Sequence, residues 1–158
     1  MTDLTHVDAE GNARMVEVGD KPITARSATA EGWITLGTEA FEAVVSRTAK
    51  KGDVLATAQL AGIQGAKRTS DLIPLCHPLP LSGVTVELTP DPETLRIVCR
   101  ATARTHWRTG VEMEALTAVS AALLTVYDML KAIDKGMALG GVRLLEKHGG
   151  RSGSWVRE

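Results

Sequence analysis

The feature that most constrains the fold is a regular spacing of apolar residues in the last third of the chain. These residues recur at intervals of 3, 4, 3, 4 and 3, at Leu116, Val119, Leu123, Val126, Leu130 and Ile133. The spacing places them along one stripe of an α-helix, and Gly136 is predicted to take the left-handed position that ends it. Such a stripe must be buried against another element, so the domain needs a second layer.

Two alternating segments upstream of this helix predict the second layer. Residues 82–89 and 94–103 each place alternate apolar residues on one face, namely Val84, Val86 and Leu88, and then Leu95, Ile97 and Cys99. The sequence PDPE between them is typical of a turn. The two segments therefore predict a β-hairpin with one solvated face.

Shorter signals predict the remaining elements. We expect a strand over 23–36, a helix with its N-cap at Thr38, a helix over 54–70, a strand over 141–147 and an edge strand in the Gly-rich tail. Segments 4–7 and 13–18 predict a hairpin or a mobile N-terminal arm over about residues 1–20. This order predicts a single α+β domain over residues 1–158, with a ferredoxin-like antiparallel sheet and helices packed on one face.

Composition argues against several classes of protein. The net charge is −1 and only 3% of the 158 residues are aromatic, so we expect no nucleic-acid partner. No run approaches the roughly 20 apolar residues of a membrane span, and we expect neither a membrane anchor nor a secretory signal. Cys76 and Cys99 form no CxxC pair and the histidines lack ligand spacing. We therefore expect no metal site and a cytoplasmic protein with reduced thiols.

The segment over 50–81 holds the first candidate site. Cys76 and His77 lie between Pro74 and Pro78, and the two prolines favour an extended loop that presents the imidazole. A single histidine beside apolar residues is more often structural than catalytic, so this loop is a candidate only.

The same segment has a helix face made of small residues. Gly62 and Gly65 each cost about 1 kcal/mol in a helix relative to alanine. Together with Ala58, Ala61 and Ala66 they form a thin face. This face predicts close approach of a sheet or of a partner helix, including one from another subunit.

The second group of candidates lies on the long helix. Glu112 and Glu114 point the same way if the chain is extended and diverge if it is helical. Asp128 and Lys131 are neighbours on a helix, although an ordinary surface pair of this kind contributes only about 0.3–0.5 kcal/mol. Glu114 and Asp128 are 14 residues apart, which is roughly 21 Å along one helix. Either the two ends have separate roles, or two subunits contribute opposite ends to each site.

Basic residues form the third group of candidates. Such residues can gather around a polyphosphate, because their side chains donate hydrogen bonds to anions. The group comprises Arg26, Lys51, Lys67, Arg68, Arg108, Lys131, Lys147 and Arg151. The Gly-rich tail can add backbone N–H donors, but the phosphate-binding spacing GxxxxGK[ST] is absent. Composition and spacing thus predict an oligomeric α+β domain with an anion site and name no substrate.

Two long motifs indicate a protein family. KGDVLATAQLAGIQGAKRTSDLIPLCHPL and TGVEMEALTAVSAALLTVYDMLKA closely resemble the MoaC family, the cyclic pyranopterin monophosphate synthases. The resemblance implies a ferredoxin-like homohexamer, a trimer of dimers with sites between subunits. It also implies that a radical SAM enzyme of the MoaA type supplies (8S)-3′,8-cyclo-7,8-dihydroguanosine 5′-triphosphate. The family converts this compound to cyclic pyranopterin monophosphate and diphosphate.

The resemblance also implies the site residues. Asp128 corresponds to the active-site acid, and we expect Lys51 and Lys131 to be catalytic with it. The expected substrate-binding residues are Leu75, Cys76, His77, Glu112, Met113, Glu114, Arg26 and Lys67. Three positions depart from the family pattern: Ser70 replaces a common Trp, Arg108 a usual Lys, and His148 a Ser of the tail.

The implied reaction needs proton transfer and phosphoryl transfer and no cofactor in principle, although Mg²⁺ can accompany the triphosphate. We expect Asp128 to stay ionised and orient Lys131, while a lysine beside another cation and partly buried loses basicity. His77 would bind the triphosphate or shuttle a proton, and arginines and lysines would stabilise the leaving diphosphate.

Two alternatives carry no catalysis. A non-catalytic nucleotide-binding accessory protein of the same pathway would bind the substrate without releasing diphosphate. A purely structural oligomer would be unaffected by a change at Lys51 as long as it folds.

Overall fold

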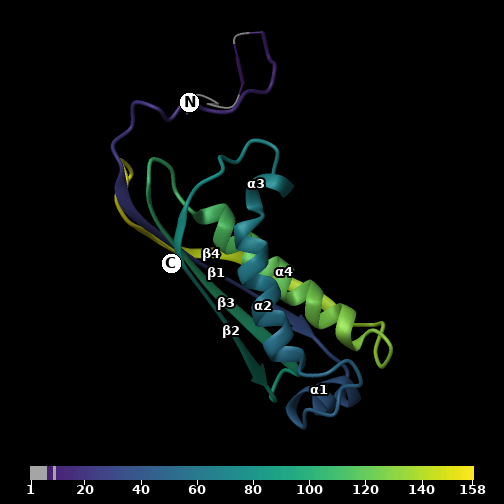
Figure 1. Ribbon diagram of the computed structural model, residues 1–158. Helices are drawn as coiled ribbons and strands as arrows, with labels where there is room; N and C mark the ends of the chain where they lie inside the picture. Colours follow the sequence, from purple (N-terminus) through teal and green to yellow (C-terminus); the bar gives the residue numbers. More distant parts are fainter. Residues whose placement is uncertain (1–6, 9) are drawn as a thin grey trace.

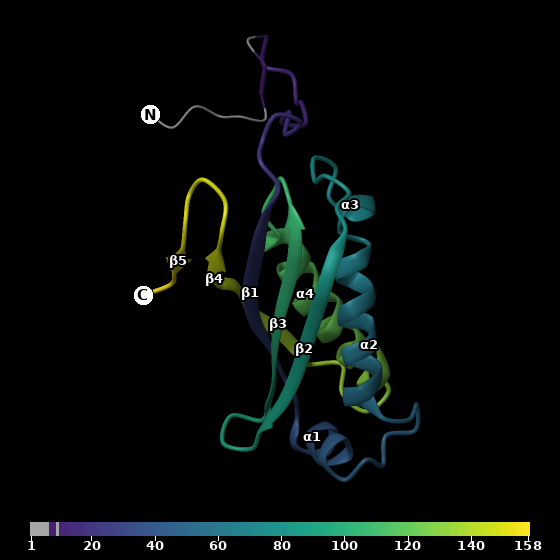
Figure 2. The ribbon, with the colours of Figure 1, turned by 60° about the vertical axis from the view of Figure 1, so that its left-hand side comes forward.

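An antiparallel five-stranded sheet, in the order β2-β3-β1-β4-β5, organises the computed structural model, which describes residues 7, 8 and 10–158. The strands are β1 (Thr24–Thr35), β2 (Leu81–Asp91), β3 (Arg96–Trp107), β4 (Ala138–His148) and β5 (Trp155–Val156). The helices are α1 (Thr38–Val45), α2 (Val54–Lys67), α3 (Thr69–Leu72) and α4 (Glu112–Leu130). Figures 1 and 2 show α2 and α4 on one face of the sheet. The predicted ferredoxin-like α+β fold is confirmed.

Small residues on the central strands let α4 lie close to the sheet. Ala28 and Ala30 of β1 pair with Ala103 and Ala101 of β3, and all four are almost completely buried. Leu123 of α4 is completely buried against this surface. Large side chains come from the helix and small ones from the strands, so the core is aliphatic and densely packed.

The thin face of α2 packs inside the same chain. A Cβ added at Gly62 would lie 3.1 Å from the backbone oxygen of Ala118, and one at Gly65 would lie 2.6 Å from the Cβ of Ala121. Both contacts are with α4, so the two helices approach almost backbone to backbone. The predicted close approach is confirmed, but its suggested inter-subunit partner is wrong for this face.

We expect Gly65→Ala to lower the free energy of unfolding by about 1–3 kcal/mol, because the added methyl group overpacks the α2–α4 contact. Gly83→Ala is the matched control, since nothing lies within 4 Å of a Cβ added there. It should change stability by less than about 0.5 kcal/mol. Urea denaturation measures both variants. A midpoint for Gly65→Ala equal to that of the wild-type chain would contradict the tight α2–α4 contact.

Asp134 explains two predicted helix ends that are wrong. Its carboxylate accepts hydrogen bonds from the backbone N–H groups of Gly37 and Gly136, each at 2.7 Å. Gly37, not Thr38, is the N-cap of α1. Helix α4 ends at Leu130, before the last residue of the predicted stripe, and Gly136 does not take a positive φ. The contact of Asp134 with Gly37 is long-range, whereas its contact with Gly136 is a local turn between residues two positions apart.

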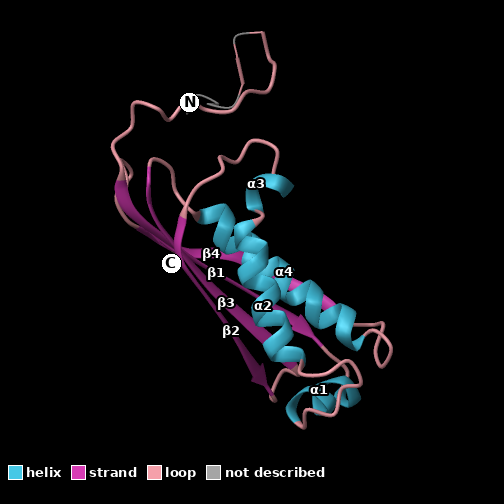
Figure 3. Ribbon diagram, in the orientation of Figure 1, coloured by secondary structure: helices cyan, strands magenta, loops and turns pink. Residues whose placement is uncertain are grey.

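Figure 3 shows the helices and strands of the described chain. Most of the other predicted elements are among them, with shifted ends. The predicted helix over 54–70 divides at Arg68 into α2 and α3. The tail returns as the edge strand β5, which pairs with β4. Val7 and Ala13 form an isolated antiparallel bridge, while residues 1–6 and 9 of the predicted hairpin or arm lie outside the described residues. Mobility of the arm stays a prediction.

Helix α4 is also long and apolar enough to cross a membrane, by length and composition alone. This differs from the expectation that no run approaches the length of a membrane span. Half of the apolar stretch of this helix is buried inside the domain. There the helix packs against the sheet and α2. The length and composition of α4 are therefore those of a core helix.

Candidate active site

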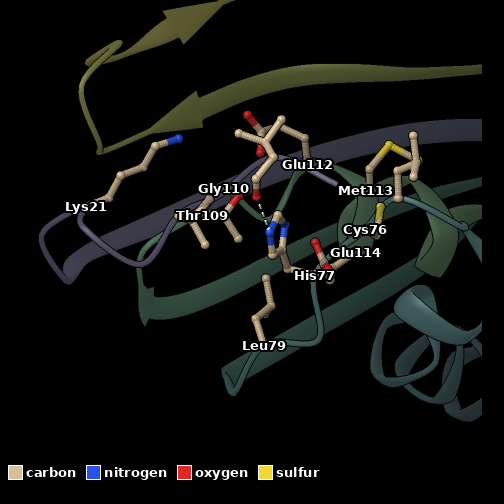
Figure 4. A pocket seen from close by; sticks show the side chains of 12 residues that line it. Lys21, Cys76, His77, Leu79, Thr109, Gly110, Glu112, Met113 and Glu114 are labelled. Atoms are coloured by element: carbon tan, nitrogen blue, oxygen red, sulfur yellow. Dashed lines mark hydrogen bonds between the residues drawn. The ribbon is translucent and has the colours of Figure 1, made fainter. Parts of the chain in front are cut away.

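A pocket of about 310 Å³ opens between the loop before β2 and the start of α4. Figure 4 shows that side chains from both elements line it. Six of the predicted substrate-binding residues are among them: Leu75, Cys76, His77, Glu112, Met113 and Glu114. The first turn of α4 and the proline-flanked loop thus bring together residues that are far apart in the sequence.

The two glutamates of this pocket diverge, as predicted for a helical segment. Glu112 begins α4 and accepts a hydrogen bond at 2.8 Å from Nζ of Lys147 on β4. Glu114 turns inward and is only 4% exposed. One carboxylate is therefore neutralised by a lysine, and the other is removed from solvent.

Burial gives the pocket a group that titrates near neutral pH. Burial raises the pKa of Glu114 to about 7, and the negative charge of Glu112 acts in the same direction. Burial and the nearby Glu114 also raise the pKa of the Cys76 thiol. The pocket therefore holds a carboxyl group that can donate or accept a proton, beside a thiol that stays neutral.

We expect the free energy of unfolding of the wild-type chain to fall, relative to that of the Glu114→Gln variant, as the pH rises. The folded state binds the Glu114 proton more tightly than the unfolded state, whose pKa is near 4.5. The loss therefore develops between pH 4.5 and about 7, amounts to about 3 kcal/mol, and is constant above that window. Urea denaturation at several pH values measures the difference, and a pH-independent difference would contradict it.

The imidazole of His77 contacts the N-terminal segment. Its Nε2 lies 2.7 Å from the carbonyl oxygen of Val16, so Nε2 carries the hydrogen and donates it. Val16, Val18 and Lys21 also line the pocket. These three residues were not predicted, because no local pattern reveals a contact between segments 61 residues apart.

The predicted catalytic residues form a second cluster at the other end of α4. Asp128 lies in the last turn, where its Oδ2 is 3.0 Å from Nζ of Lys51 and its Oδ1 is 2.7 Å from Nζ of Lys131. Lys51 also donates to the backbone oxygen of Asp128 at 2.8 Å. This Asp128 cluster, made of these three residues, therefore joins the turn before α2 to the end of α4.

Charge pairing sets the protonation of the Asp128 cluster. Hydrogen bonds from Lys131 and then Lys51 hold the pKa of Asp128 below its usual range, so it is ionised as predicted. The same pairing raises the pKa of Lys131. The expected loss of basicity is therefore wrong for Lys131 within one protomer, because its neighbour is an exposed carboxylate and burial is slight.

The structure does not bring the two groups of predicted residues together within one chain. Helix α4 is continuous from Glu112 to Leu130, so its rise separates Glu114 from Asp128 by roughly 21 Å. Arg26 and Lys67 belong to neither group. Arg26 donates from Nε to the backbone oxygen of Trp107 at 3.1 Å, and Lys67 is exposed in the last turn of α2.

Among the described residues, no group of three or more His, Cys, Asp or Glu side chains is placed to hold a metal ion. The side chains of the two sites supply carboxyl groups, amines, an imidazole and a thiol.

Comparison with known proteins assigns the chain to a family. Residues 15–150 match the MoaC family. A cyclic pyranopterin monophosphate synthase of Methylobacterium sp. (strain 4-46) is 60% identical over 158 residues, covering 100% of this chain and 99% of the relative. Synthases of the same name from Rhodospirillum rubrum and Cereibacter sphaeroides are 60% and 58% identical over 97% of this chain, covering 92% and 96% of the relatives. The chain belongs to the MoaC family.

Proposed function

We propose that the chain is a cyclic pyranopterin monophosphate synthase, a phosphorus–oxygen lyase of molybdenum cofactor biosynthesis. It converts (8S)-3′,8-cyclo-7,8-dihydroguanosine 5′-triphosphate to cyclic pyranopterin monophosphate and diphosphate. The observation that carries the proposal is the pocket at the start of α4, where six residues of the family motifs converge in a chain about 60% identical to proteins of that name.

The chemistry of the two sites suits this rearrangement. It opens a purine-derived ring, rebuilds a pyrazine ring by amine attack, and closes a cyclic phosphate with loss of diphosphate. Glu114 can exchange protons near neutral pH because burial raises its pKa to about 7. Lys131, whose pKa is raised by Asp128, is a proton donor, and the Asp128 cluster offers two ammonium groups to developing negative charge.

We further propose that the catalytic site is shared between subunits of a homohexamer built as a trimer of dimers. Within one chain the pocket and the Asp128 cluster lie at opposite ends of α4, roughly 21 Å apart. One nucleotide-sized substrate cannot place a single reacting atom near both. If a neighbouring copy contributes its Asp128 cluster to this pocket, every predicted catalytic group reaches the same substrate.

The remaining parts of the proposal concern cofactors and partners. The reaction uses no resident metal or organic cofactor, and any Mg²⁺ arrives with the triphosphate as part of the substrate. Arg26 and Lys67 supply further contacts to phosphate. The protein works in the cytoplasm, where a radical SAM enzyme of the MoaA type hands over the substrate.

The test is incubation of the purified protein with the cyclised triphosphate, with diphosphate and cyclic pyranopterin monophosphate measured by mass spectrometry. We expect stoichiometric formation of both products. Binding of the substrate without diphosphate release would refute catalysis and favour a nucleotide-binding accessory protein.

A further inference from the structure

The segment over residues 16–21 forms one side of the pocket, although it belongs to no helix or strand. Val16, Val18 and Lys21 all line the cavity, and Figure 4 shows Lys21 at one end of it. Strand β1 begins only at Thr24. The position of this segment therefore depends on its contacts with the rest of the domain.

Two hydrogen bonds attach the segment to opposite parts of the site. His77 donates from Nε2 to the carbonyl oxygen of Val16 at 2.7 Å. Arg108, which follows β3, donates from Nη1 to the carbonyl oxygen of Gly19. The backbone N–H of Lys21 also donates to the oxygen of Val18 at 3.1 Å, which closes a turn. These contacts fix the point from which the Lys21 side chain leaves the backbone.

The charges around the pocket leave one amine for an anion. Of the residues that line it, Lys21 is the one lysine or arginine. The negative charge of Glu112 is balanced by Lys147 at 2.8 Å, and the raised pKa of Glu114 keeps part of that group neutral near pH 7. Lys21 forms no salt bridge with any carboxylate in the described part of the chain.

We propose that Lys21 binds the phosphate chain of the substrate, and that Arg108 positions it by holding the segment over residues 16–21. An ammonium group is a common ligand of phosphate, and its hydrogen bonds to an anion are stronger than neutral ones. The identity of the ligand rests on the proposed function, whereas the anion site itself rests on the place of Lys21 in the pocket lining. The segment is then a substrate-binding part of the site.

The first experiment compares Lys21→Ala with Arg14→Ala, which removes the same charge from an exposed residue just before this segment that does not line the pocket. Two quantities are measured: the KM for the cyclised triphosphate, and the affinity for inorganic tripolyphosphate by calorimetry. We expect Lys21→Ala to raise the KM and weaken tripolyphosphate binding by about tenfold each. Arg14→Ala should change neither, and Lys21→Arg should restore most of the affinity.

The second experiment tests the role of Arg108. Arg108→Gln should raise the KM severalfold in the wild-type background and have little effect in the Lys21→Ala background, because it acts through Lys21. A purely structural role would give the same effect in both backgrounds and would overturn the positioning role.

The outcomes separate this proposal from the proposed function. Equal tripolyphosphate affinities of Lys21→Ala and Arg14→Ala, or no tripolyphosphate binding by the wild-type chain, would overturn the role of Lys21. A wild-type chain that releases no diphosphate would refute the synthase activity, while the tripolyphosphate comparison would still test the anion site.

Discussion

Asp128→Asn is expected to lower the single-turnover rate of product formation by about 10³-fold while the protein stays folded. The carboxylate lies between two ammonium groups, at 3.0 Å from Nζ of Lys51 and 2.7 Å from Nζ of Lys131. The amide keeps the shape and loses the charge that orients both amines and that raises the pKa of Lys131. Lys51→Ala and Lys131→Ala should cause losses of similar size.

A matched control separates this effect from the loss of a surface ion pair. Asp71 forms a salt bridge with Arg68 at 3.2 Å, with the same three-residue spacing as Asp128 and Lys131 and similar exposure. Asp71→Asn should change neither the rate nor the fold, since exposed pairs contribute at most about 1 kcal/mol. Near wild-type product formation by all three variants of the Asp128 cluster would refute their assignment.

Mixing two inactive variants is expected to restore about a quarter of the wild-type activity if sites are shared between two subunits. One variant is Asp128→Asn, and the other is Glu114→Gln, which carries its defect in the pocket. Random pairing makes half of all dimers mixed. Each mixed dimer has one site with both defects and one site with neither. One quarter of all sites in the mixture are therefore intact, although each variant alone is inactive.

The control mixture combines Asp128→Asn with Lys51→Ala. Both changes lie in one cluster of contacts within the same chain, so every Asp128 cluster in the mixture is defective and no activity should return. The mixtures are made by co-expression with two affinity tags and purification of the mixed assemblies. Failure of the first mixture to exceed its parents would show that each site is complete within one chain.

Local patterns were sufficient to predict the main elements of the fold. The stripe of α4 and the alternation of β2 and β3 are set by residues three, four or two positions apart. Most of the same side chains form the observed core, but Ile133, the last residue of the predicted stripe, is exposed. The closely packed face of α2 was also predictable, because Gly62 and Gly65 weaken a helix unless another backbone lies near. Its partner was not, because the sequence does not specify which element covers it.

Contacts across the fold limited the prediction of the site. Lys147 reaches Glu112 through the register of β4 on β1, which shifts between Thr29 and Ala30. The bond between His77 and Val16 joins a loop to a segment with no regular structure. Such contacts depend on how strands align and where loops lie, so only the assembled domain shows them.

Because α4 is continuous, the number of its residues sets both the distance and the relative orientation between the pocket and the Asp128 cluster. Each residue in a helix adds about 1.5 Å along the axis and a rotation of about 100° around it. A single residue inserted in the middle would therefore swing Asp128 a quarter-turn or more away from Lys51, even if the core repacked. Variation in length should therefore be excluded from this helix across related chains.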